Sequence, residues 1–313
     1  MDLTPIGRLT RLTRLVVDVG SFEDTEPLLN LGRLRELNLK WANARSVHGF
    51  GRAFPALESL KLQGRGFRDM DGLRAIPHLT HLALSHLDQL RDLSPFAAMP
   101  RLESLRIENC ENLTTLDGLG PHPRLAELAI DSCHSLHSLD GLGDQPELHT
   151  VKLFGGRSLT DLGGLARLPA LHTLYINGTD LSDIDELAGS PLVELRLLWM
   201  KGLESLSSLQ HCPGLKRLTL WGCPRVEDIP DSLESLSLTA ADWKKHLSRI
   251  AGQENLRFLE LVAPPEDVSP LLGMPSLTHL RVHARSGIIT DSGTLDPVVG
   301  ELRKRGVSVA IGR

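Results

Sequence analysis

Residues 102–107 read Leu-Glu-Ser-Leu-Arg-Ile, and residues 125–130 read Leu-Ala-Glu-Leu-Ala-Ile. Both stretches follow the pattern Leu-x-x-Leu-x-(Leu, Ile or Val), which recurs along the whole chain. The pattern starts at Leu12, Leu34, Leu57, Leu79, Leu102, Leu125, Leu148, Leu171, Leu192, Leu215, Leu233, Leu256 and Leu277. Successive starts are 21 to 23 residues apart, except for one step of 18 after Leu215. A regular step of this length predicts a repeat protein.

The composition supports the same interpretation. The chain has 313 residues, of which 63 are leucine, whereas aromatic residues make up only 4%. A bias towards one apolar residue indicates that one packing problem is solved many times. Stacked repeats bury their cores against neighbouring repeats, so the chain can form one solenoid without splitting into ordinary domains.

Each repeat is expected to contribute one strand to a parallel sheet. Side chains alternate between the two faces of a strand, so Leu128 and Ile130 are predicted to point into the core. Glu127, Ala129 and Asp131 are predicted to point outward. Because the longer return segment needs more room, we expect the sheet on the concave face and short helices, 3-10 turns and loops on the convex face.

The pattern resembles the leucine-rich-repeat family, and its 22–23-residue step is most similar to the bacterial internalin-like class. The resemblance implies an α/β repeat fold, a curved horseshoe, over residues 1–313 with about 13 repeats. Members of the family usually have asparagine at the ninth position of the repeat, where this chain has Cys110, Cys133, Cys223 and Thr179. These are expected to be small buried residues. Cys110 and Cys133 could approach disulfide distance, although free thiols are favoured.

The two ends of the chain differ. Residues 2–12 align without gaps on residues 92–102, which predicts that the chain begins within a return segment and is a fragment. The alternative is a degenerate half-repeat that acts as its own cap. Residues 294–313 are predicted to form a closing cap: a helix with Asp296 as its N-cap, Gly306 just past its end and a strand over 307–311. A second helix is expected over 242–250, with Trp243, Leu247 and Ile250 on one face.

No catalytic motif occurs, and no enzyme activity, metal or cofactor is predicted. The histidines and cysteines between residues 78 and 137 lack the spacing of a zinc site, and are expected to be surface and core residues. The formal net charge of −5 argues against a general nucleic-acid binder. No apolar run is long enough for a membrane span and no signal peptide is recognisable, so a cytoplasmic setting is expected.

Aromatic and arginine side chains concentrate at outward positions of the four repeats that start at Leu148, Leu171, Leu192 and Leu215. Such residues are enriched at protein interfaces, so a protein or peptide ligand on the concave face is predicted. The candidate binding residues are Trp41, Lys152, Phe154, Tyr175, Arg196, Leu198, Trp199, Arg217 and Trp221. Alternatively, Trp41 and Trp199 fold over the sheet edge and pack on the neighbouring turn. Charges of both signs recur on this face, which favours a protein over a polyanion.

The leading functional hypothesis is a non-enzymatic recognition scaffold. A leucine-rich array with a missing N-terminal part resembles the C-terminal sensor domain of bacterial NLR-like NTPases of the NACHT or STAND type. That resemblance implies a ligand-sensing array that controls an upstream NTPase domain in the same polypeptide, often in antiphage defence. One alternative is a free-standing adaptor or regulatory subunit that binds an enzyme. Another is a surface adhesin of the internalin type.

Overall fold

The computed structural model describes residues 2–18, 22–40, 44–74, 76–226, 228–239, 243–263, 267–283 and 295–312. The chain divides into two compact units, Met1–Leu171 and His172–Arg313. Both units are built from the repeat that the sequence predicts.

Among its described residues, the first unit contains seven strands and a series of short helices. The strands are β1 (Arg14–Val17), β2 (Glu36–Leu39), β3 (Ser59–Gln63), β4 (His81–Ser85), β5 (Ser104–Glu108), β6 (Glu127–Asp131) and β7 (Thr150–Phe154). The helices are α1 (Thr4–Gly7) and α2 (Phe50–Ala53), with the 3-10 turns η1 (Glu26–Asn30), η2 (Asp71–Leu73), η3 (Ser94–Phe96) and η4 (Gly163–Leu165).

The described part of the second unit contains another seven strands and two longer helices. The strands are β8 (Thr173–Asn177), β9 (Glu194–Leu198), β10 (Arg217–Trp221), β11 (Ser235–Thr239), β12 (Phe258–Val262), β13 (His279–His283) and β14 (Ser308–Gly312). The helices are α3 (Trp243–Ile250) and α4 (Leu295–Lys304), with the 3-10 turns η5 (Asp185–Leu187), η6 (Ser207–His211) and η7 (Ser269–Gly273).

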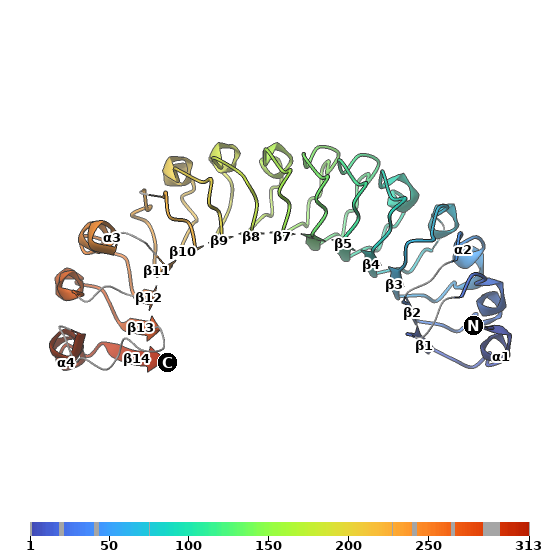
Figure 1. Cartoon of the computed structure of the whole chain (residues 1–313), viewed down its shortest axis with the longest axis horizontal. Coiled ribbons are helices and arrows are strands. Elements are labelled where there is room, and N and C mark those ends of the chain that lie inside the picture. Colours follow the sequence, from blue (N-terminus) through green and yellow to red (C-terminus); the bar gives the residue numbers. More distant parts are fainter. Residues whose placement is uncertain are drawn as a thin grey trace. The chain divides into compact units, whose positions relative to one another are not determined.

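Within each unit the strands pair in sequence order, and every described pair is parallel. Repeat positions stay in register, so Leu128 of β6 lies opposite Leu105 of β5 and Val151 of β7. The register holds even across the 18-residue step, where Arg217 lies opposite Ser235. In each unit the strands line the inner side of the curve and the helices and 3-10 turns lie on the outer side (Figure 1). The predicted leucine-rich-repeat solenoid fold is therefore confirmed, while its extent as one solenoid over 1–313 stays a prediction.

The core consists of the inward side chains of the strands and of the return segments. Leu128 and Ile130 are 0% and 3% exposed, as the alternation predicts. Ala129, which is predicted to point outward, is only 4% exposed. It lies in register between Arg106 of β5 and Lys152 of β7, whose side chains are much longer than its own.

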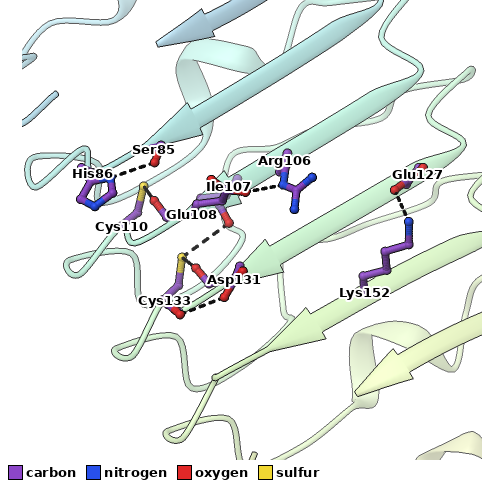
Figure 2. Close-up of polar contacts among 11 residues, drawn as sticks. Ser85, His86, Arg106, Ile107, Glu108, Cys110, Glu127, Asp131, Cys133 and Lys152 are labelled. Atoms are coloured by element: carbon purple, nitrogen blue, oxygen red, sulfur yellow. Dashed lines mark hydrogen bonds and ion pairs between the residues drawn. The ribbon is translucent and has the colours of Figure 1, made fainter. Parts of the chain in front are cut away.

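Eight of the described strands end in the same kind of turn. The eighth position of eight repeats has a left-handed backbone, with φ between 52° and 68°; these residues are His86, Asn109, Ser132, Gly155, Gly178, Trp199, Gly222 and Ala263. Among the ninth-position residues that follow, Cys110, Cys133, Thr179 and Cys223 are buried. The Cys110 thiol donates to the backbone carbonyl of Glu108, and the Cys133 thiol donates to the backbone carbonyls of Ile107 and Asp131 (Figure 2). All four cysteines are free, so the ninth-position thiols act as small buried donors.

The predicted helix over 242–250 corresponds to α3, in which Leu247 and Ile250 are fully buried; the side chain of Trp243 lies outside the described part.

The closing helix is α4. It begins at Leu295, so the prediction that Asp296 precedes the helix is wrong. Pro297 is tolerated there because the N–H groups of a first helical turn have no partner within the helix. Gly306 does follow the end, at φ +86°. The amide of Val307 donates to the Leu302 carbonyl at 3.0 Å, as in a glycine-terminated helix.

Candidate functional site

The predicted binding residues divide between the two units. Lys152 and Phe154 lie on β7 of the first unit. Tyr175, Arg196, Leu198, Trp199, Arg217 and Trp221 lie on or directly after β8, β9 and β10 of the second unit. Trp41 lies outside the described residues. The second unit therefore holds most of the candidate site.

Lys152 belongs to a set of charge pairs on the inner face of the first unit. Its Nζ lies 2.6 Å from Glu127 Oε1 on the neighbouring strand (Figure 2). The other pairs on this face are Arg14–Glu36, Lys40–Asp18 and Arg106–Glu108. Each base meets one acid, so these charges largely neutralise each other.

The second unit has a different arrangement around Glu194. Its Oε1 accepts hydrogen bonds from Arg196 Nε at 2.7 Å and from Tyr175 Oη at 3.3 Å. Its Oε2 accepts one from Arg217 Nε at 2.9 Å. The Arg196 guanidinium also stacks on the Tyr175 ring, with Cζ 4.8 Å from the ring centroid. We call these four residues the Glu194 cluster, in which one acid holds two arginines.

The environment of Glu194 shifts its titration. Burial on its own would raise the pKa of the Glu194 carboxyl, because it disfavours the charged form. The hydrogen bonds from Arg217 and Arg196 outweigh burial and hold the pKa below its usual value of 4.5. A carboxyl whose pKa is lowered by folding stabilises the protein above its unfolded-state pKa, and this stabilisation is lost as the pH falls through the folded-state pKa.

We therefore expect Glu194→Gln to lower stability at pH 7 by about 1 kcal/mol, since two charge-assisted hydrogen bonds are weakened. The difference from wild type should shrink below pH 4.5 and vanish once the wild-type carboxyl is protonated. Urea unfolding between pH 7 and pH 3 measures this. Glu103→Gln, at an exposed carboxylate with no ion pair among the described residues, is the control. A Glu194→Gln difference that stays constant with pH contradicts the assignment.

A second group of polar contacts surrounds Glu260. Trp221 Nε1 donates to Ser237 Oγ at 2.9 Å, and Ser237 Oγ donates to Glu260 Oε2 at 2.8 Å. Glu260 Oε1 lies 2.8 Å from His283 Nε2 and 3.5 Å from Arg281 Nη1. These five residues form the Glu260 cluster. It fixes the indole of Trp221, which is half-buried, at the end of β10.

The Glu260 cluster has the residue types of a hydrolase triad but not its connections. A nucleophilic serine needs a hydrogen bond to the histidine that takes its proton. Here Ser237 is bonded to the carboxylate, and it is only 6% exposed. Among the described residues, no group of three or more histidine, cysteine or acidic side chains is placed to hold a metal ion. The arrangement is suited to positioning side chains on a surface.

The apolar part of the site lies at the edge where β9 and β10 end. Trp199 occupies the left-handed eighth position, and its side chain is 60% exposed. Its ring lies over Gly222 of the next repeat, where an added Cβ would come within 2.5 Å of Trp199 Cε3. Leu198 and Trp221, one position earlier on each strand, are half-buried. We call Leu198, Trp199 and Trp221 the tryptophan edge. Trp199 thus does fold onto the neighbouring turn, and one of its faces remains open to solvent.

Sequence reasoning identified the arginines and aromatic residues but left out the acids that fix them. Glu194, Glu260 and Ser237 are not among the predicted binding residues. Both glutamates lie at outward strand positions beside an arginine of the same or the next strand. An outward acid next to arginine was therefore the available signal.

Comparison by sequence finds no match: no family model matches the chain. No curated protein matches it either.

Comparison by structure finds leucine-rich-repeat proteins. An internalin from Listeria monocytogenes, inlF, is 21% identical with a TM-score of 0.58, over 89% of this chain and 76% of that chain. Internalin C2 from the same organism is 20% identical with a TM-score of 0.41, over 67% of this chain and 80% of that chain. The leucine-rich-repeat domain of APL1B is 15% identical with a TM-score of 0.45, over 100% of this chain and 84% of that chain. At such identities the likeness concerns the fold alone, and the fold is that of a leucine-rich-repeat protein.

Proposed function

We propose that the chain is a non-enzymatic scaffold that recognises a protein or peptide on the inner face of its second unit. The observation that carries this proposal is the state of Trp199. A large aromatic side chain in a left-handed backbone is unfavourable by about 1–2 kcal/mol relative to a right-handed one. Its exposed face adds the unfavourable hydration of apolar surface. The left-handed backbone recurs at the eighth position of other repeats, so it is the large exposed ring at this position that a bound partner would explain.

The surroundings of Trp199 support the same function. Interface hot spots are enriched in tryptophan, tyrosine and arginine, and they work best when the side chains are held in place before binding. Trp221 is held by Ser237, and Tyr175 by Glu194 and the stacked guanidinium of Arg196. The second unit therefore presents aromatic groups that lose little further freedom when they bind.

The experiment that tests the proposal compares wild type with the Tyr175→Ala/Trp221→Ala double variant. Partners retained by the immobilised wild-type chain are identified, and their affinity is measured by calorimetry. We expect the double variant to bind its partner at least about 2 kcal/mol more weakly. It lacks two aromatic side chains that the partner would bury on binding. Circular dichroism checks that the variant still folds. A folded double variant whose affinity changes by well under about 1 kcal/mol contradicts this site.

A narrower form of the proposal concerns biological setting. The resemblance to sensor domains of bacterial NLR-like NTPases suggests that binding here controls an NTPase domain in the same polypeptide. A free-standing adaptor and an internalin-type adhesin are compatible with the same binding function. No helix of the described residues has the length and apolar character needed to cross a membrane. The genomic reading frame decides among the three: a P-loop upstream supports the NTPase, whereas a native start at Met1 or an export signal contradicts it.

A further inference from the structure

The inner faces of the two units differ in their balance of charge. In the first unit, the outward strand positions carry five lysines or arginines, five acids and one histidine: Arg14, Lys40, Lys61, Arg106 and Lys152 against Asp18, Glu36, Glu108, Glu127 and Asp131, with His81. In the second unit, the corresponding positions carry three arginines, two acids and two histidines: Arg196, Arg217, Arg281, Glu194, Glu260, His279 and His283. The second face therefore has a surplus of positive charge although the chain as a whole is acidic.

The surplus is concentrated at the Glu194 cluster, where one carboxylate neutralises only one of two guanidinium charges. Glu194 is 14% exposed, whereas the side chains of Arg196 and Arg217 are 46% and 51% exposed. Both arginines use Nε to reach Glu194. Within the described ranges, their Nη atoms have no hydrogen-bond partner. The pair of Nη atoms at the end of a guanidinium is the edge that binds a carboxylate in two parallel hydrogen bonds.

Apolar surface lies close to these guanidinium groups. Leu198 follows Arg196 by two residues on the same face of β9, a separation of about 7 Å along the strand. Trp199 and Trp221 continue the apolar surface from there to the end of the sheet. A partner that fills this surface would thus place an acidic group and an apolar group near each other.

We propose that the Arg196–Arg217 pair binds an aspartate or glutamate side chain of a partner protein, while the tryptophan edge binds an apolar side chain close to it. This inference rests on the proposed function and narrows its partner to an acidic, partly apolar protein segment. A polyanion such as nucleic acid fits less well, because Glu194 and Glu260 lie on the same face and repel a continuous line of phosphates.

A random peptide library displayed on phage, panned against the full chain, tests the proposal. We expect the selected peptides to be enriched in aspartate or glutamate with a large apolar residue nearby. Synthetic copies of these peptides should bind an Arg196→Gln/Arg217→Gln variant at least about tenfold more weakly than wild type. Arg106→Gln is the matched control, because Arg106 is a half-exposed arginine at a fifth position, paired with Glu108 alone. It should change affinity by less than about twofold.

The outcomes separate the inference from the function on which it rests. Selected peptides without acids, whose binding needs Trp199 and Trp221 but neither arginine, overturn the acidic partner and keep the binding function. A library that yields no binding peptide counts against both. A mixed-sequence single-stranded oligonucleotide that binds in an arginine-dependent way, and better than any peptide, overturns the inference in favour of a polyanion. Circular dichroism and thermal unfolding confirm that each variant remains folded.

Discussion

Replacing Leu128 by alanine is expected to lower the free energy of unfolding by about 2–5 kcal/mol, the usual range for a leucine in a close-packed core. Leu128 is 0% exposed and lies in register between Leu105 and Val151 of the two neighbouring strands. Side chains of both neighbouring repeats would line the cavity left by the alanine. Loss of the leucine side chain therefore weakens the contacts among three successive repeats. In a repeat protein these nearest-neighbour contacts supply most of the stability.

The matched control is Leu9→Ala, the same chemical change at a leucine that is 54% exposed. Its effect should stay within about 0.5 kcal/mol, because little apolar surface is returned to water. Urea unfolding followed by circular dichroism measures both variants. Equal effects of the two substitutions would contradict the role of Leu128 as a core residue of a stacked sheet.

The fold was predictable because it depends on a local pattern that is repeated many times. A leucine at an inward strand position must be buried in every repeat, and a single shift of register would expose all of them. That is why the positions of Leu128 and Ile130 followed from the sequence. The burial of Ala129 did not follow from the sequence, because it depends on the length of side chains on two other strands and not on the direction in which Ala129 points.

The candidate site was predictable only in part. Alternation showed that Tyr175, Arg196 and Trp221 point outward, and the scarcity of aromatic residues made their grouping visible. It could not show which side chains bond to each other across strands, because those contacts depend on rotamers and on neighbours far away in sequence. The structure was therefore needed to show that Glu194 holds the arginines and that Glu260 holds the histidine.

Trp199→Asn is expected to weaken partner binding by about 2 kcal/mol or more while leaving the stability of the free chain unchanged or raising it by up to about 1 kcal/mol. Asparagine adopts the left-handed conformation more readily than tryptophan, and this chain already has Asn109 at the equivalent position, with φ 52°. Calorimetry with a partner captured by the wild-type chain gives the affinity, and thermal unfolding gives the stability. A residue kept for folding would show the opposite result, with lower stability and unchanged binding.

A second variant changes the position of the Trp199 ring without changing the residue. In Gly222→Ala the added Cβ would meet the Trp199 ring, whereas in Gly178→Ala it would have nothing within 4 Å. Both glycines have nearly the same backbone conformation, at φ +68° and +66°, so the strain of the alanine itself should cost about 1 kcal/mol in each. Gly222→Ala should additionally displace the ring, shift tryptophan fluorescence and weaken binding, as Trp199→Asn does. If Gly178→Ala weakens binding equally, strain in the turns and not the placement of Trp199 controls affinity, and the tryptophan edge is not the contact surface.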